Sequence, residues 1–346
     1  MAVLTALHTA VPHHVHNQHD IATFMSHYLS LPDVQGRQLN WMYRRSGIKT
    51  RYSCLPDFSS SSAYLFDNQE FVSIDTRMAL YEKEALKLSL EAIQPLSLEG
   101  ITHLVTVPCT GMVAPGLDIQ LVKALGLCSQ VVRTSVNFMG CYGALHGLKL
   151  AQAFCDAQKN ARVLVVCTEL CTLHLQRATD WESLTSALLF GDGSAACIVE
   201  SDSGQPGMVL TGFFSDIAIS GEEDMAWRIS STGFLMRLSS EIPKKLKIPL
   251  ASLVQRALGD ELKQVDWLIH PGGKDILEAT QKALGLESSD LTHSYQVLKD
   301  FGNMSSPTIL FVLAAWMKTN PNNRKAFLAA FGPGITLESL LIHTRA

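Results

Sequence analysis

Cys141 has the local sequence expected of a nucleophile. It lies in Asn137-Phe-Met-Gly-Cys-Tyr-Gly143, between an apolar β-rich run and an apolar helical run. A thiol at the start of a helix lies at the positive end of the helix dipole, which lowers its pKa. The flanking glycines leave room for a bulky substrate. The alternative is a buried cysteine that packs as a small apolar residue.

His270 and Asn303 are the second and third candidates. His270 ends the apolar run 265–270 and precedes Pro-Gly-Gly, so its imidazole is expected beside exposed backbone amides. There it can pair with a thiolate or donate to an oxyanion; the alternative is a core histidine bonded to a carbonyl. Asn303 lies in Gly302-Asn-Met-Ser-Ser306. Its amide either donates to a thioester carbonyl or caps the helix that follows.

The elements that must position these residues alternate along the chain. Apolar β-rich runs predict strands at residues 101–107, 131–137, 162–168, 195–200, 208–213, 265–270, 326–331 and 337–342. Helical periodicity predicts helices at residues 73–93, 117–125, 142–157, 249–258, 274–284 and 307–318. Near-continuous apolar strands between helices indicate an α/β fold with a sheet covered on both faces.

The order of elements repeats along the chain. Lys123-Ala-Leu-Gly126 recurs as Lys282-Ala-Leu-Gly285, an offset of 282 − 123 = 159 residues, and Gly140-Cys141 and Gly302-Asn303 differ by 302 − 140 = 162. We expect an internal duplication with two α/β halves, residues 1–203 and 204–346. Ligands of such folds bind at strand ends and helix starts, so a pseudo-two-fold axis would bring the three candidates to one centre.

Composition narrows the class of protein. The 346 residues include 28 Lys plus Arg and 32 Asp plus Glu, a formal charge of −4 that argues against nucleic-acid binding. Charged residues make up 17% and hydrophobic residues 47%, as expected for a large core or a subunit interface. No apolar run reaches the roughly 20 residues of a membrane span. Eight irregularly spaced cysteines and no export signal favour a cytoplasmic location.

No cofactor site is expected from the sequence. Four histidines lie between positions 13 and 19, but they lack neighbours at metal-ligand spacing and are expected on a surface loop. A phosphate-binding glycine loop and a dinucleotide fingerprint are both absent from the sequence. We therefore expect neither a metal nor a prosthetic group.

The three candidates together resemble a known family. The order Cys141, His270-Pro-Gly-Gly273, Gly302-Asn-Met-Ser-Ser306 and Phe331-Gly-Pro-Gly334 is similar to that of the type III polyketide synthases, relatives of chalcone synthase. Phe190-Gly-Asp-Gly-Ser-Ala195 also resembles a turn of that family. The resemblance runs from about residue 40 to the end. It implies a thiolase-like fold: a duplicated, five-layered α-β-α-β-α arrangement.

The resemblance also implies a mechanism. Cys141 would be loaded from an acyl-CoA, and His270 would keep the thiol ionised. His270 and Asn303 would then hold the thioester carbonyl of malonyl-CoA during decarboxylation. The resulting enolate would attack the Cys141 thioester, in an enzyme that is expected to be a homodimer and to need no metal.

Further residues are carried over from the family pattern. The implied cavity wall consists of Cys109, Ala114, Cys171, His174, Phe190, Met236, Ser305, Gly332 and Pro333, and the implied CoA contacts are Arg45, Gly272 and Gly273. Ala114 and Cys171 are smaller than, or differ from, the residues of plant members, and they resemble bacterial members that accept long acyl chains through a tunnel. Trp227 falls near a position that is often glycine, which would shrink the elongation cavity. An alkylpyrone or alkylresorcinol product is therefore expected.

Two alternative functions remain open at this point. The first is a single-round β-ketoacyl synthase III-like enzyme that takes acyl-carrier thioesters. Because only Arg45 matches the family's usual cations at the CoA mouth, an acyl-carrier protein remains a possible partner. The second is a non-catalytic protein of the same fold that binds acyl thioesters.

Overall fold

The central element of the fold is a nine-stranded sheet. The structure, a computed structural model, describes residues 1–59, 64–66, 71–218, 221–259 and 264–346. The strand order is β11-β12-β13-β8-β1-β7-β6-β4-β5. The strands are β1 (Ala2–Ala10), β4 (His103–Val107), β5 (Val132–Ser135), β6 (Arg162–Leu170), β7 (Asp192–Ser201), β8 (Gly207–Ile217), β11 (Val265–Ile269), β12 (Lys325–Gly332) and β13 (Thr336–Arg345).

The two halves of this sheet have the same topology. In the first half β4 is parallel to β6, β6 is antiparallel to β7, and β7 is antiparallel to β1. In the second half β11 is parallel to β12, β12 is antiparallel to β13, and β13 is antiparallel to β8. The halves join where Ala2–Leu4 of β1 pair with Met208–Leu210 of β8. The predicted duplication is therefore confirmed.

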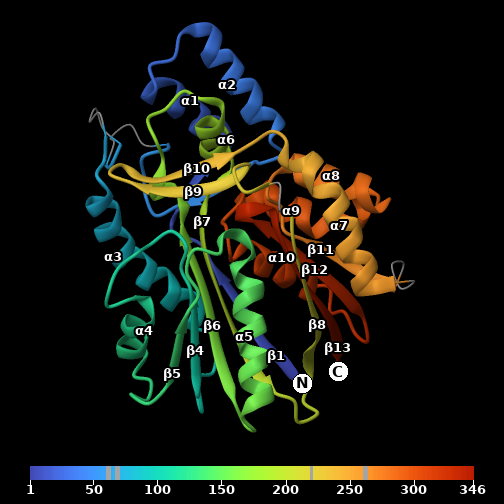
Figure 1. The fold of residues 1–346 in the computed structure, drawn as a ribbon. Helices are drawn as coiled ribbons and strands as arrows, with labels where there is room; N and C mark the ends of the chain where they lie inside the picture. The colour runs from blue at the N-terminus through green and yellow to red at the C-terminus, as the bar shows by residue number, and fades with distance from the viewer. Residues whose placement is uncertain (60–63, 67–70, 219–220, 260–263) are drawn as a thin grey trace.

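The helices complete five layers. The middle layer contains α5 (Gly143–Ala157) and α10 (Thr308–Met317), whose side chains share one core with both half-sheets. The outer layers contain α3 (Ile74–Ile93) and α4 (Leu117–Leu125) on the first half, and α7 (Ile242–Leu258) and α8 (Lys274–Leu284) on the second. Figure 1 shows these outer helices on opposite sides of the molecule.

Alternation along β6 explains the layering. Val163, Val165 and Cys167 belong to the core shared with α5 and α10. Leu164 and Val166 belong to the core shared with α3 and α4. Successive side chains of a strand point to opposite faces, so a strand that is apolar throughout must be covered on both faces, as the sequence predicted.

A cap lies on one end of the sheet. It contains the hairpin of β9 (Met225–Ser230) and β10 (Gly233–Leu238), the pair β2 (His14–Asn17) and β3 (Thr50–Ser53), and the helices α1 (Gln18–Tyr28), α2 (Asp33–Arg45) and α6 (Trp181–Leu189). The helix α9 (Thr292–Phe301) precedes the Asn303 segment. In Figure 1 α2 forms the end of the molecule opposite the two chain termini. The cap and α9 were not predicted from the sequence.

Two sequence-based expectations need correction. The helix predicted at residues 249–258 is longer than expected: α7 begins at Ile242, and Pro249 lies inside it. The histidine-rich segment is not all surface loop: His14–Asn17 form β2, and the buried His16 bonds to Ser59 Oγ and to the Leu55 carbonyl. Among the described residues no helix is long and apolar enough to cross a membrane.

Candidate active site

The nucleophile lies in a tight turn between the two half-sheets. Cys141 is the central residue of a 3-10 turn, Gly140–Tyr142, that leads directly into α5. Gly140 has a φ of +72°, and a Cβ atom there would lie 2.5 Å from the ring of Pro333. A Cβ at Gly143 would lie 2.8 Å from Val107. The two glycines therefore let the turn pack against both half-sheets.

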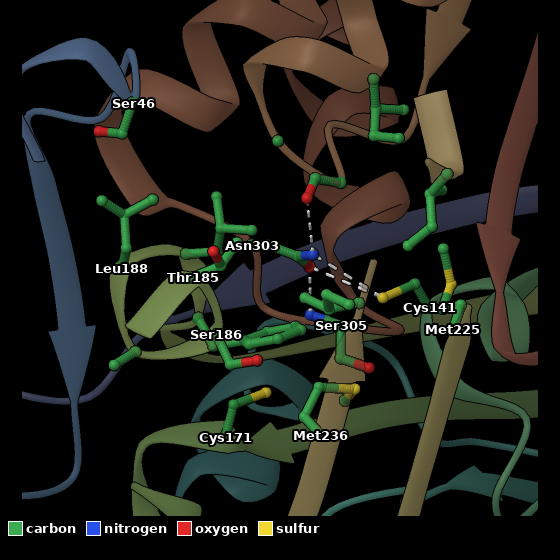
Figure 2. Close-up of a pocket in the computed structure, with 18 of the residues that line it drawn as sticks. Ser46, Cys141, Cys171, Thr185, Ser186, Leu188, Met225, Met236, Asn303 and Ser305 are labelled. Carbon is green, nitrogen blue, oxygen red and sulfur yellow. Dashed lines mark hydrogen bonds between the residues drawn. The ribbon is translucent and has the colours of Figure 1, made fainter. Parts of the chain in front are cut away.

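Asn303 is brought to the same place by the second half. Its backbone N–H donates to Leu189 O at 2.9 Å, and its carbonyl accepts from Gly191 N at 2.9 Å. Its Oδ1 accepts from Ser305 N at 2.8 Å, which turns Nδ2 toward the cavity, 3.9 Å from Cys141 Sγ (Figure 2). Helix α10 begins only at Thr308, after the capping residue Pro307. The helix-cap alternative for Asn303 is therefore wrong.

His270 follows β11 and faces the same cavity. Its backbone N–H donates to Ala329 O at 2.8 Å, and its side chain is 1% exposed. Neither ring nitrogen has a hydrogen-bond partner among the described residues. The alternative of a core histidine bonded to a carbonyl is thus not observed. Buried polar atoms nearly always have partners, so this ring is available to the thiol or to a ligand.

Burial controls the protonation of the pair. Burial raises the pKa of Cys141 to about 11, although hydrogen bonds with Ser305 and Asn303 act against this rise. Burial also lowers the pKa of His270 to about 3. The expected lowering of the thiol pKa by the helix dipole is therefore outweighed. Each group alone is neutral at pH 7, and a thiolate is favoured only when the proton stays on His270 as a neighbouring imidazolium.

The side chains of Cys141, His270 and Asn303 all line one cavity of about 610 Å³. Most of the residues carried over from the family pattern line the same cavity. They are Cys109, Cys171, His174, Phe190, Met236, Ser305 and Pro333 of the implied wall, and Arg45, Gly272 and Gly273 of the implied CoA contacts. Figure 2 shows Cys171 and Met236 on the side of the cavity below Asn303 and Ser305.

Two of the carried-over residues lie elsewhere. Ala114 is exposed on the loop between β4 and α4 and is not among the described residues that line the cavity. Gly332 lies behind the wall, where a Cβ atom would be 2.5 Å from the ring of Tyr142. Within one chain, therefore, a small residue at position 114 does not widen the cavity, and Gly332 serves packing.

Glu169 is a buried residue of this region that sequence reasoning missed. Its carboxylate accepts hydrogen bonds from Cys109 N, Thr110 N, Thr110 Oγ1 and Ser306 Oγ. Burial raises the pKa of Glu169 to about 7, against those hydrogen bonds. It ties the end of β4 to the second half of the fold. The sequence could have indicated it, because Glu169 is a carboxylate near the end of a mostly apolar predicted strand.

An aromatic stack closes the cavity on the hairpin side. The rings of His174 and Phe234 lie 4.1 Å apart, and Trp227 lies 4.9 Å from Phe234 and 4.9 Å from Phe138. His174 Nδ1 accepts from Phe234 N, so Nε2 donates to Thr110 O at 2.7 Å. Burial lowers the pKa of His174 to about 4. The neutral imidazole therefore holds the hairpin, and with it Trp227, against the catalytic half.

No cluster of three or more His, Cys, Asp or Glu side chains suited to a metal ion occurs within the described ranges. The site consists of a thiol, an imidazole and a carboxamide around an apolar cavity. Such a set can accept an acyl group on sulfur and stabilise a developing oxyanion with neutral donors.

Comparison with known proteins identifies the family. The family described as chalcone and stilbene synthases matches over both of its parts, the N-terminal domain at residues 1–203 and the C-terminal domain at residues 215–346. The alpha-pyrone synthesis polyketide synthase-like Pks18 of Mycobacterium tuberculosis is 32% identical, over 99% of this chain and 91% of the relative.

Solved structures agree over the whole chain. The polyketide synthase PKS-I of the brown alga Ectocarpus siliculosus is 27% identical with a TM-score of 0.92, covering 99% of this chain and 98% of that one. The 1,3,6,8-tetrahydroxynaphthalene synthase of Streptomyces coelicolor is 25% identical with a TM-score of 0.89, covering 99% of both chains. The chain belongs to the chalcone and stilbene synthase family and is a type III polyketide synthase of thiolase-like fold.

Proposed function

We propose that this enzyme loads an acyl-CoA starter onto Cys141 and extends it with malonyl-CoA by decarboxylative Claisen condensation. The observation that carries this proposal is the convergence of three side chains on one cavity. They are the Cys141 thiol, the unpartnered imidazole of His270 and the oriented carboxamide of Asn303.

The loading step follows from the acid–base properties of the pair. Cys141 Sγ forms a bond to the thioester carbon of the starter while its proton passes to His270. The bond from that carbon to the CoA sulfur breaks, and the CoA thiolate takes the proton back from His270. Burial disfavours each isolated charge, so the proton transfer and the attack are coupled.

The extension step uses His270 and Asn303 as donors. In malonyl-CoA the bond to the carboxylate breaks, CO₂ leaves, and the electron pair forms an enolate on the thioester. The oxyanion of this enolate accepts hydrogen bonds from a ring N–H of His270 and from Asn303 Nδ2. The enolate carbon then attacks the Cys141 thioester and releases the thiolate. One such oxyanion donor contributes about 2.7–4 kcal/mol.

Medium or long acyl starters fit the cavity. Its wall beside the nucleophile includes Cys109, Cys171, Phe190 and Met236. The buried cation that lines the cavity, Arg51, already donates to Gln18 Oε1 and to the Phe190 carbonyl. A relative matched over nearly the whole chain is named for alpha-pyrone synthesis. We propose an alkylpyrone as the product, with an alkylresorcinol as the other ring closure. These steps use only side chains and CoA thioesters, without a metal or prosthetic group.

The proposal extends to the assembly and its location. Phe138, three residues before Cys141, exposes 37% of its surface, and Met112 on the loop after β4 exposes 50%, which supports a homodimer that covers them. The boundary between the two duplicated halves, residues 1–203 and 204–346, is part of this proposal. Eight cysteines without a disulfide partner suit the reducing cytoplasm.

The two alternative functions are distinguishable. A single-round synthase would take the chain from an acyl-carrier protein and release one linear condensation product. A non-catalytic binding protein would lack at least one of Cys141, His270 and Asn303, and all three are in place. Acyl delivery by a carrier protein is compatible with the mouth of the cavity, where Arg45 stacks 4.9 Å above Trp41.

The decisive experiment uses acyl-CoAs of graded chain length with isotope-labelled malonyl-CoA and mass spectrometry of the products. We expect pyrones that contain two or more labelled units, with the highest yield from medium or long starters. The Cys141→Ser variant serves as the matched control and should give none. Products limited to triacetic-type lactones with every starter would refute the long-chain assignment, and a single labelled unit in a linear product would favour the single-round synthase.

A further inference from the structure

The outward face of α2 exposes large apolar side chains. Val34 and Trp41 lie seven residues apart on one side of the helix and are each 58% exposed, while Leu39 and Tyr43 on the opposite side are buried. Arg37 and Arg44 flank the two apolar side chains and are exposed. The face therefore combines exposed apolar side chains with cations, the pattern of helices that lie at a membrane surface.

A second exposed tryptophan lies on a neighbouring element. Trp181 begins α6 and is 57% exposed, and Trp41 and Trp181 both line the mouth of the active cavity. The helices α2 and α6 are adjacent, and α2 forms one end of the molecule (Figure 1). Tryptophan is enriched where one side of a residue meets lipid and the other meets water.

The charge of this face is opposite to that of the whole chain. Helix α2 carries Arg37, Arg44 and Arg45 against the single acid Asp33, while the chain carries a formal charge of −4. Among the described residues, the arginines that form ion pairs do not include Arg37 or Arg44. The acids beside Trp181 are engaged elsewhere: Asp180 caps α6 and Glu182 pairs with Arg237.

We propose that this face, defined by Val34, Arg37, Trp41, Arg44 and Trp181, docks the enzyme on a lipid bilayer that contains anionic lipids. The tryptophans and Val34 enter the headgroup region, and the arginines contact lipid phosphates. The mouth of the apolar cavity then opens against the bilayer, so that a long acyl chain or alkyl product passes between lipid and cavity with little exposure to water. That consequence rests on the proposed function, whereas binding to the bilayer does not.

Flotation of the full-length protein with lipid vesicles tests the proposal. We expect binding to phosphatidylcholine vesicles that contain phosphatidylglycerol, little binding to phosphatidylcholine alone, and weaker binding at high salt. Each cation near an anionic surface contributes about 1 kcal/mol, so Arg37→Gln with Arg44→Gln should lower the affinity roughly 30-fold. Trp41→Ala with Trp181→Ala should lower it as well, and tryptophan emission of the unmodified protein should shift to the blue on vesicles.

A matched control removes the same charge elsewhere. Lys123 lies in the last turn of α4, and Lys159 lies in the turn that follows α5; both are exposed. In Figure 1 α4 and the end of α5 lie away from α2. Lys123→Gln with Lys159→Gln should bind vesicles as the unmodified protein does. The Arg37/Arg44 variant should keep its activity on a short, soluble acyl-CoA, because neither residue lines the cavity.

Three outcomes would overturn the proposal. One is no binding of the unmodified protein to anionic vesicles at low salt. Another is an equal loss of binding in both double-glutamine variants, which would show that vesicle binding depends on the total charge of the chain and not on this face. The third is failure to bind vesicles combined with arginine-dependent binding of an acyl-carrier protein, which would make the face a carrier-protein surface. If the unmodified enzyme does not condense soluble acyl-CoA with malonyl-CoA, the proposed function is refuted instead, whatever the result with vesicles.

Discussion

Replacement of His270 by alanine tests how the nucleophile is activated. Burial raises the pKa of Cys141 to about 11 when no imidazolium lies beside it. At pH 7 such a thiol is roughly 0.01% thiolate, whereas a thiol with the usual pKa of about 8.5 is roughly 3% thiolate. Because the thiolate is the reactive form, Cys141 of His270→Ala should be alkylated roughly 300-fold more slowly than an ordinary exposed cysteine. In the unmodified enzyme His270 should make Cys141 the faster of the two.

The chain provides its own reference for this measurement. Cys128 is exposed and unpaired, so iodoacetamide labelling followed by peptide mass spectrometry gives both rates in one sample. In His270→Ala the Cys141 rate should rise about tenfold per pH unit between pH 7 and 10, because the thiolate fraction does so. Equal Cys141 rates at pH 7 with and without His270 would refute the reasoning and assign the activation to another group.

Three further predictions concern the rest of the site and the fold. Asn303→Ala should still accept the acyl group on sulfur but should decarboxylate malonyl-CoA about 10²- to 10³-fold more slowly; release of labelled CO₂ at the normal rate would contradict its role as a donor. Trp227→Ala should enlarge the cavity beside Met236 and give products with more malonyl units from the same starter, and an unchanged product mass distribution would show that the hairpin does not limit extension. Glu338 is buried, and although burial raises its pKa, hydrogen bonds from His146, Lys149 and Ser215 lower it to about 2. Since the folded pKa lies below the unfolded value of about 4.3, this carboxylate stabilises the fold above that pH by about 3 kcal/mol, and the contribution is lost as the pH falls toward 2. Denaturant unfolding of Glu338→Gln should therefore lose less stability between pH 5 and pH 3 than the unmodified protein, and equal losses would contradict the assignment.

The layers of the fold were predictable from the sequence because they depend on local patterns of apolar residues and helix-ending glycines. The strands β4, β6 and β12 are nearly continuous apolar runs, which a sheet covered on both faces explains. Gly126 and Gly285 end α4 and α8 with left-handed φ values of 62° and 66°, so the repeated Lys-Ala-Leu-Gly segment reflects one structural unit used twice. The predicted helix 117–125 has the bounds of α4.

The cap was not predictable because tertiary packing decides it. The hairpin β9–β10 has side chains that alternate poorly between apolar and polar, and its position depends on His174 and Phe234, which lie about 60 residues apart in the chain. The strand β1 stands alone at the start of the chain, and its partners β7 and β8 follow about 200 residues later.

The site was predictable in its chemistry and less so in its geometry. Cys141, His270 and Asn303 were found from their positions at the junctions of elements. By contrast, the exposed position of Ala114 depends on the course of the loop before α4, and the role of Gly332 depends on the ring of Tyr142. The protonation of the pair depends on burial, which the helix-dipole argument did not include.

The central claim is that Cys141 carries the growing chain. The most direct measurement is peptide mass spectrometry of the enzyme after brief incubation with a long-chain acyl-CoA in the absence of malonyl-CoA. We predict one added acyl group, on the peptide that contains Cys141, and none in Cys141→Ala. An acyl group on Cys109 or Cys171 of the unmodified enzyme, or an acylated Cys141→Ala variant, would contradict the account.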